Sequence, residues 1–412
     1  MSPTTSLTSL VVVHPHSSKP LTSLSRNLWV PSGARGVFGG QVIAQSLLAA
    51  SSTISSPLGL HSTHCYFLLP AHAQPTIEYR VEKLRDGKSY ASRLVRAWQG
   101  DREVFVLLAS YTLPPTILPS GLGNRVAETE NEAKDDGLKV SNSLRFSSPP
   151  STTSSATVKN VTPASSPIED RRTSKRESSS SNNNNPGFQE KYQVPFAEDL
   201  LPWEECEEEA VRWQKWMDER GDKFKGNTKT FLEEYIRERR ESPVSIARAL
   251  TREHDISANH HVRMSWLRAR LDPSEKPNEE TVKAMIAYMT DFQFIGTASR
   301  SVGLHQSSTP RLGMLASLDH SIHFYPFPSN FDPSAPLLHV MESQVVDVAS
   351  GRGTVKGYVY TQDGVLVAVT SQEGVVRADL RGLEAKGLVE GGAVEDDESE
   401  RKGKRKTVKA KL

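Results

Sequence analysis

Glycines and histidines are the first residues whose type and spacing could carry chemistry. Gly39 and Gly40 precede a segment with helical spacing of apolar residues, and the first turn of a helix presents backbone N–H groups that bind oxyanions or phosphates. Close packing of this helix on a sheet explains the same glycines equally well. Asp319 and His320 suggest an acid–base dyad, but neighbouring residues of a strand point to opposite faces. The glycines therefore remain binding candidates, and the adjacent pair is not expected to act as a dyad.

Two histidine-containing blocks in the chain are similar to each other. HSTHCYFLLP (residues 61–70) and SLDHSIHFYP (residues 317–326) align without a gap, which sets His64 against His320. Each block follows a helix-like segment and precedes alternating apolar strands, a pattern that indicates a duplicated module. A histidine pair present in both copies favours a structural role, whereas His61 remains a candidate substrate contact.

Composition limits the class of protein. The 412 residues suffice for two or three domains, and a net charge of +1 gives no electrostatic reason to expect nucleic-acid binding. Two cysteines, Cys65 and Cys206, favour a reducing compartment over a disulfide framework. We find no apolar run long enough to span a membrane, no signal-peptide pattern and no zinc-ligand spacing, so we expect no membrane span and no metal.

Residues 1–116 predict the first module. SLVVV (residues 9–13) is a candidate strand, and apolar residues recur at helical spacing from Gln41 onward. Four long strands follow, with a hairpin turn at residues 85–88 (RDGK). One helix followed by four antiparallel strands is an α+β module in which the sheet wraps around the helix.

The remainder of the chain divides into four parts. Residues 117–195 are rich in Ser, Asn and Pro and are expected to be disordered. Residues 196–242 predict two amphipathic helices that pack on the core rather than on a partner. Residues 243–385 repeat the helix-and-strands pattern, with a helix beginning at Asn278, and the polar tail 386–412 is expected to be disordered.

Several of these segments together resemble the type II acyl-CoA thioesterases, the family of bacterial thioesterase II and the peroxisomal acyl-CoA thioesterases. The matching stretches are GVFGGQVIAQSLLAA, HSTHCYFLLP, VEKLRDGKSYASRLVRAWQ, YMTDFQF, ASLDHSIHF and YTQDGVLVAVTSQEGVVR. The resemblance implies a double hotdog fold, that is, two antiparallel sheets that each wrap around a central helix. The long segment at about 117–240 departs from the family pattern, and its role is not implied by the resemblance.

The resemblance also implies a catalytic set, namely Asp291 in YMTDFQF, Ser317 in ASLDHS and Gln372 in SQEGVV. In the family these side chains hold a water that attacks the thioester carbonyl. The chemistry is consistent with this set, because Asp291 can accept the proton of the water while Ser317 and Gln372 position it. An Asp at this place could equally be a helix cap or a surface ion-pair partner.

The first copy of the module lacks the same groups. When the two helices are overlaid by their apolar patterns, Gln45 falls near Asp291, and His61 falls opposite Ser317. An amide cannot serve as a general base, so the first copy is expected to be catalytically silent and to shape the acyl pocket.

The resemblance therefore predicts hydrolysis of fatty acyl-CoA to free fatty acid and coenzyme A. Coenzyme A is then part of the substrate, no cofactor is expected, and pairing of sheets edge to edge suggests a homo-oligomer. The alternatives are a non-catalytic acyl-CoA-binding protein and a hotdog-fold enoyl-CoA hydratase, whose D-x-N-P-x-H motif is absent from the sequence.

The last three residues, Ala410, Lys411 and Leu412, are a close variant of the S-K-L address that the peroxisomal import receptor reads. The basic run KGKRK before them could instead be a nuclear localisation patch. Because the resembled family has peroxisomal members, the peroxisomal matrix is the expected location.

Overall fold

A computed structural model describes residues 6–114, 200–220, 226–249, 254–257, 260–305, 308–347 and 349–381. Both predicted modules lie in one compact unit, which comprises residues 1–118 and 195–412. The segment expected to be disordered and the C-terminal tail fall outside the described residues. No helix among the described residues is long and apolar enough to cross a membrane.

The N-terminal module contains one long helix and the four long strands that the sequence predicts. Its elements are α1 (Leu7–Val11), β1 (His14–Pro15), β2 (Thr22–Leu24), α2 (Gly39–Ser51), β3 (Gly59–Phe67), β4 (Glu78–Asp86), β5 (Tyr90–Gln99) and β6 (Arg102–Thr112). The predicted turn at residues 85–88 coincides with the connection between β4 and β5.

The prediction of a strand at residues 9–13 is wrong, because Leu7–Val11 form the short helix α1. Leu7, Leu10 and Val11 are all buried, and their spacing of three and four residues suits a helix that covers α2 and α7. The carbonyl of Leu10 also accepts hydrogen bonds from the side chains of Gln41 and Gln45 at 3.1 and 2.8 Å. Tertiary packing therefore overrides the β-propensity of the Val run.

The C-terminal module begins with helices and continues with a second set of strands. Its elements are η2 (Trp203–Glu205), α5 (Glu209–Arg220), α6 (Asn227–Glu241), β7 (Val244–Arg248), β8 (His254–Ser257), β9 (His260–Ala269), α7 (Glu279–Thr290), α8 (Phe294–Ser301), β10 (Arg311–Ser317), β11 (Asp319–Phe324), β12 (Leu337–Asp347), β13 (Arg352–Tyr360) and β14 (Leu366–Asp379). As predicted, the helices in the 196–242 segment pack against this unit, and α5 and α6 both contact β7.

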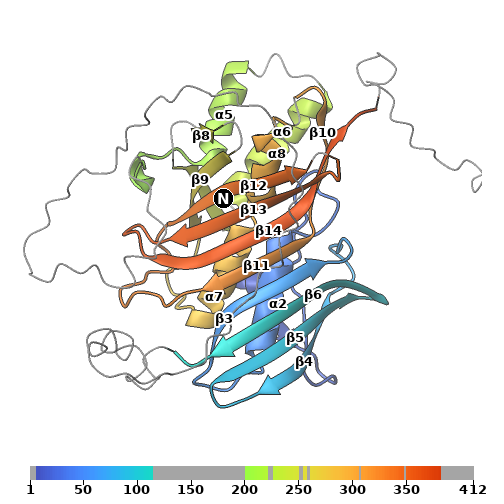
Figure 1. The fold of residues 1–412 in the computed structure, drawn as a ribbon, viewed down its shortest axis with the longest axis vertical. Coiled ribbons are helices and arrows are strands. Elements are labelled where there is room, and N and C mark those ends of the chain that lie inside the picture. The colour runs from blue at the N-terminus through green and yellow to red at the C-terminus, as the bar shows by residue number, and fades with distance from the viewer. Residues whose placement is uncertain are drawn as a thin grey trace, which may run out of the picture. The chain divides into compact units, whose positions relative to one another are not determined.

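The strands of the two modules join into one antiparallel sheet. The strand order is β1-β2-β4-β5-β6-β3-β11-β14-β13-β12-β9-β7, with β10 paired to β14 and β8 paired to β9. The seam is the pair β3–β11, in which His320 lies opposite Cys65 and Ser321 opposite His64. The two predicted hotdog sheets are therefore halves of a single sheet, which curves around the helices (Figure 1).

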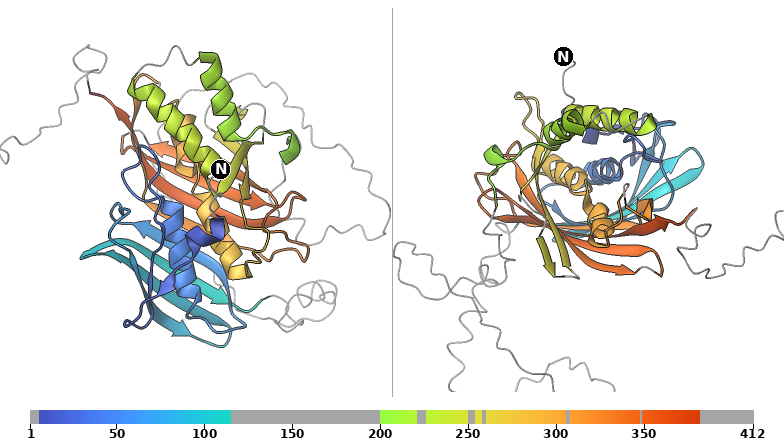
Figure 2. Two further views of the ribbon diagram at one scale, coloured as in Figure 1. Left: turned by 180° about the vertical axis from the view of Figure 1, so that it is seen from behind. Right: turned by 90° about the horizontal axis from the view of Figure 1, so that it is seen from above.

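Helices α2 and α7 lie side by side inside the curved sheet, as the views in Figure 2 show. Most residues of both helices are buried, so each helix is apolar on nearly all sides, as expected for a central helix. Helix α7 begins at the Asn278 cap, whose side chain accepts a hydrogen bond from the Thr281 N–H at 2.9 Å, and it ends at Asp291. This end point fixes the position of the candidate catalytic carboxylate.

The ungapped alignment of the histidine blocks is wrong as a structural equivalence. His320 is 1 % exposed, whereas His64 is an exposed residue whose ring lies 5.5 Å from that of His323. A slip of one residue moves every side chain of a strand to the opposite face. The overlay of Gln45 on Asp291 fails as well, because Gln45 lies within α2, whereas Ser52 occupies the position after its end.

Candidate active site

Asp291 lies where the end of α7 meets the beginning of α2. Its Oδ2 accepts the backbone N–H of Gly40 at 2.8 Å, and its Oδ1 accepts the side-chain amide of Gln372 at 2.8 Å. The Asp291 side chain is only 7 % exposed. The carboxylate thus lies at the first turn of α2, where the free backbone N–H groups of a helix point. We call Asp291, Gly40 and Gln372 the Asp291 junction.

Both predicted glycines, Gly39 and Gly40, lie against Asp291. A Cβ atom on Gly39 would lie 2.8 Å from Oδ2 of Asp291, and one on Gly40 would lie 2.5 Å from the carbonyl oxygen of Tyr288. Close approach therefore requires glycine at both positions. The N–H of Gly40 is directed to the Asp291 carboxylate, so this donor serves an internal anion.

Gln372 connects the carboxylate to a buried histidine. It lies on β14, across from His320 on the adjacent strand β11, and its Nε2 is 3.1 Å from Nδ1 of His320. His320 Nδ1 is also 3.7 Å from Oδ1 of Asp291. Among the described residues, Oε1 of Gln372 and Nε2 of His320 are buried and have no hydrogen-bond partner. Gln372 thus retains a free acceptor beside the carboxylate.

Ser317 is the third member of the predicted set. It is half-buried at the end of β10 and pairs with Gly374, two residues beyond Gln372 on β14. Paired residues and alternate residues share one face of a sheet, so Ser317 faces the same side as Gln372, about 7 Å along the strand. The structure therefore places all three predicted residues around one end of α7.

A second buried histidine lies behind the junction. The ring of Phe294 is 5.3 Å from the ring of His320 and 5.2 Å from that of His339. Burial, followed by the charges of His320 and Arg263, lowers the pKa of His339 to about 3. His339 is not predicted from the sequence pattern, and His320 is predicted only as a structural residue. The signal for His320 was its phase in β11, where it alternates with the outward-facing positions.

Cys65 is buried across the seam from His320. Its Sγ donates to the carbonyl oxygen of His320 at 3.1 Å. Burial first, and then the negative charges of Asp291 and Asp319, raise the pKa of this thiol well above its usual value. Cys65 therefore stays protonated and is not a nucleophile.

His61 is not brought to Asp291. Its Nε2 lies 2.9 Å from Oγ of Ser110, and its ring centroid is 5.9 Å from that of Tyr90. Burial first, then the charges of His323 and Lys283, lower the pKa of His61. Lys283 is on the first half of α7, so His61 belongs to the other end of the helix pair.

At that other end, the end of α2 meets the beginning of α7. Glu280 Oε2 accepts the hydroxyl of Ser51 at 2.9 Å, and its Oε1 accepts the N–H of Leu60 at 3.0 Å. The ammonium group of Lys283, which is 5 % exposed, lies 3.3 Å from Oε1 of Glu280 and 2.7 Å from Glu279. We call Glu280, Ser51, Leu60 and Lys283 the Glu280 junction, which lies about 16 Å along α7 from Asp291.

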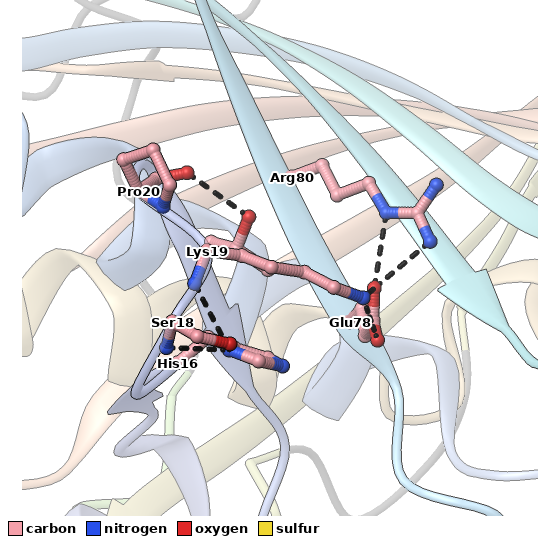
Figure 3. Close-up of polar contacts among 7 residues, drawn as sticks. His16, Ser18, Lys19, Pro20, Glu78 and Arg80 are labelled. Atoms are coloured by element: carbon pink, nitrogen blue, oxygen red, sulfur yellow. Dashed lines mark hydrogen bonds and ion pairs between the residues drawn. The ribbon is translucent and has the colours of Figure 1, made fainter.

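A surface hollow of about 460 Å³ also lies at the far end of α2, where Lys19, Thr53 and Lys83 are among its lining residues. Figure 3 shows that Lys19 is already paired with Glu78, at 2.8 Å, and that Arg80 binds the same carboxylate. The hollow is about 18 Å from the start of α2, and it contributes nothing to the Asp291 junction. Among the described residues, no cluster of His, Cys, Asp and Glu could hold a metal ion.

Comparisons with known proteins agree with this geometry. Residues 26–112 match the model of an acyl-CoA thioesterase N-terminal domain, and residues 204–376 match that of an acyl-CoA thioesterase C-terminal domain. The second match begins before α5 and thus takes in the two helices of the 196–242 segment.

Matches to individual relatives range from one fifth of the chain to most of it. Acyl-coenzyme A thioesterase 8 of Rattus norvegicus is 25 % identical over 365 residues, which are 88 % of this chain and 86 % of that protein. Peroxisomal acyl-coenzyme A thioester hydrolase 1 of Saccharomyces cerevisiae is 32 % identical over 83 residues, 20 % of this chain and 24 % of that protein. The crystal structure of the acyl-CoA thioesterase II TesB2 from Mycobacterium marinum superposes with a TM-score of 0.53 at 19 % identity, covering 90 % of this chain and 98 % of that one.

The fold is thus the double hotdog of the thioester hydrolases, with one carboxylate junction at each end of its helix pair. The chain belongs to the type II acyl-CoA thioesterase family.

Proposed function

We propose that the protein hydrolyses fatty acyl-CoA thioesters to free fatty acid and coenzyme A at the Asp291 junction. The observation that carries this proposal is a buried carboxylate held only by neutral donors, the Gly40 N–H and the Gln372 amide. Such a carboxylate is held in one orientation and can serve as a general base. Relatives named as acyl-CoA thioesterases along most of the chain support the substrate class.

In the proposed reaction, one water molecule is positioned beside Asp291 and Gln372. The water donates one hydrogen bond to Asp291 and the other to the unpartnered Oε1 of Gln372. Its oxygen attacks the thioester carbonyl carbon while Asp291 takes the proton. The C–S bond then breaks, Asp291 returns its proton to the departing thiolate of coenzyme A, and the free acid is released. Ser317 assists in holding the water or the developing oxyanion.

His320 takes the role of a positioning residue in this proposal. Its Nδ1 lies 3.1 Å from Nε2 of Gln372, and a neutral ring with a bare Nδ1 accepts a hydrogen bond from that amide. This contact fixes the orientation of the amide, so that Oε1 rather than Nε2 faces the water.

We further propose that the reaction needs no cofactor and no metal, since water is the nucleophile and coenzyme A enters with the substrate. Gly39 and Gly40 contribute by their small size and by the N–H that holds Asp291. The predicted substrate contact of His61 is not part of the proposal, because its contacts lie at the other end of α7 from Asp291.

The cellular setting is also a proposal. Ala410, Lys411 and Leu412 lie outside the described residues, and their S-K-L-like pattern suggests the import receptor of the peroxisomal matrix. The word peroxisomal in the name of the S. cerevisiae relative supports this location. Full-length fluorescent fusions with and without these three residues test it.

The proposed homo-oligomer is tested by size-exclusion chromatography with light scattering, where a monomer would contradict it.

The experiment that tests the reaction is thiol release from acyl-CoAs of several chain lengths, comparing the wild type with Asp291→Asn. We expect activity in the wild type and a loss of about 10³-fold in the variant, because asparagine retains the volume but cannot accept the proton. Equal activity in both proteins would keep the reaction and overturn the site. No activity in either, with acyl-CoA binding retained, would favour the non-catalytic acyl-CoA-binding protein.

A further inference from the structure

Helices α5 and α6 contact both chain segments that form the Asp291 junction. One is the loop of residues 29–38, which leads into Gly39 and Gly40, and the other is the turn of residues 291–293 between α7 and α8. On the loop, the Glu238 carboxylate accepts the N–H of Ser32 at 2.9 and 3.1 Å. Phe231 packs so closely that a Cβ atom on Gly33 would lie 3.1 Å from its ring. Helix α6 thereby holds the loop that supplies the donor to Asp291.

Arg239 of α6 connects this loop to the turn. Arg239 is only 8 % exposed. Its guanidinium carbon lies 5.0 Å from the ring centroid of Phe292 and 5.6 Å from that of Trp29. Phe292 directly follows Asp291, and Trp29 begins the loop. A buried guanidinium between aromatic faces is attracted to both rings, so Arg239 holds the two sides of the junction together.

Glu209 of α5 acts on the turn itself. Both of its carboxylate oxygens lie 3.1 Å from Nε2 of Gln293, while the hydroxyl of Ser265 donates to Oε1 of Gln293 at 3.3 Å. Gln293 has a φ of 64°, the left-handed conformation that a residue with a side chain adopts only when its surroundings compensate. It lies two residues after Asp291, at the point where the chain leaves α7 and enters α8.

We propose that α5 and α6 form a clamp that positions Asp291 for catalysis, with Glu209 and Arg239 as its positioning residues. Glu209 stabilises the left-handed turn at Gln293, and Arg239 keeps Phe292 against Trp29. The clamp sets the distance between Asp291 and its donors, on which the proton transfer depends. This inference rests on the proposed function, because it assigns the helices a role in the same reaction.

Packing of α5 and α6 on the core and positioning of Asp291 by these helices predict different results. If the helices only pack on the core, removal of Glu209 lowers the melting temperature and leaves kcat unchanged in the folded protein. If they position Asp291, the same change lowers kcat at temperatures far below unfolding and leaves KM nearly unchanged. The effect should further depend on the residue at position 293, because glycine adopts the left-handed conformation without side-chain support.

The experiment compares Glu209→Ala, Glu209→Gln and the exposed α5 control Glu219→Ala in the full-length protein, measuring kcat and KM for one acyl-CoA. We expect kcat to fall about tenfold in Glu209→Ala, to recover largely in Glu209→Gln, which still accepts a hydrogen bond from Gln293, and to stay unchanged in the control. When Gln293→Gly is already present, adding Glu209→Ala should lower kcat by less than about twofold.

The melting temperature is a readout that needs no activity. It is measured for the wild type, for the single variants Glu209→Ala and Gln293→Gly, and for the double variant. Glu209→Ala should lower the melting temperature when Gln293 is present and much less when Gln293→Gly is also present. A wild type without hydrolysis but with this coupling would overturn the proposed function and leave the coupling between Glu209 and the turn intact. A loss of kcat of the same size with and without Gln293→Gly, or no loss at all, would overturn the clamp.

Discussion

The Asp291 junction and the Glu280 junction are built alike and differ in one respect. At each, a carboxylate at an end of α7 accepts a backbone N–H from the N-terminal module, Gly40 in one case and Leu60 in the other. Asp291 receives its second hydrogen bond from a neutral amide. Glu280 instead lies beside the Lys283 ammonium group, which is nearly inaccessible to solvent.

In the proposed reaction, this difference favours the Asp291 junction over the Glu280 junction as the site of the base. The donors of Asp291 are a backbone N–H and a side-chain amide, both of them neutral. Glu280 instead pairs with the Lys283 ammonium group at 3.3 Å while it accepts hydrogen bonds from Ser51 and Leu60. Asp291 is therefore the candidate base of the proposed reaction, whereas Glu280 belongs to an ion pair with Lys283.

The largest effect is expected for a substitution of Glu280. Replacement by alanine leaves Ser51 and the N–H of Leu60 without their acceptor and removes one of the two partners of buried Lys283. We expect the free energy of unfolding in urea to fall by about 3 kcal/mol, with hydrolysis within about twofold of wild type. Glu279→Ala is the matched control, because that side chain is 63 % exposed and should cost less than about 1 kcal/mol. A loss of hydrolysis comparable to that of Asp291→Asn would mean that both ends do chemistry.

At the catalytic end, Gln372→Ala removes an amide that both binds Asp291 and is proposed to hold the water. We expect kcat for acyl-CoA to fall about 100-fold, equivalent to about 2.7 kcal/mol. Gln45→Ala is the control, because Gln45 is a buried amide of the other module and bonds only to Leu10, Arg26 and Tyr79 among the contacts described. Gln45→Ala should lower the melting temperature and change kcat little. Equal losses of kcat in Gln372→Ala and Gln45→Ala would contradict the difference between the two ends.

His339 lies behind the Asp291 junction and should make that end acid-sensitive. Its pKa is about 3 in the folded protein, below the ordinary value of 6.5, so the unfolded chain binds more protons between these pH values. Stability therefore falls as the pH drops below 6.5, by about 2 kcal/mol from this residue at pH 5. Unfolding of His339→Leu at pH 7 and pH 5 should lack this contribution, whereas exposed His64→Leu should keep it. Identical pH dependence in His339→Leu and wild type would contradict the assignment.

The smallest effect is expected at His61. Because its contacts are with Ser110 and Tyr90 at the far end of α7, His61→Ala should change kcat and KM by less than about twofold. A tenfold rise in KM would restore the role in substrate binding that its position in the sequence block suggested.

The sequence predicted the parts whose signal is local. The four long strands of the N-terminal module, the helix that starts after Asn278 and the turn between β4 and β5 follow from periodicity and turn residues, and the structure confirms them. Asp291, Ser317 and Gln372 came from the family resemblance, and the structure brings them to one end of α7. The comparisons confirm the family and the hydrolase class.

What could not be predicted depends on contacts between distant segments. The phase of a strand against its partner decides whether His320 or His64 is buried, and an alignment of letters does not contain that phase. The Glu280 junction joins residues far apart in the chain, and α1 is helical because it covers α2 and α7. The sequence analysis also left unexplained how the helices of the 196–242 segment meet the turn at Gln293.

The seam between β3 and β11 has a consequence for how the chain can diverge. The two modules associate through paired strands and helices, so the segment between β6 and η2 only has to span the distance between them. The entropy of closing such a loop grows with the logarithm of its length, and each doubling costs only about 0.6 kcal/mol. Insertions between the modules are therefore thermodynamically inexpensive, whereas a single-residue insertion within the seam would turn one strand over and move the side chain of Cys65 or His320 to the opposite face.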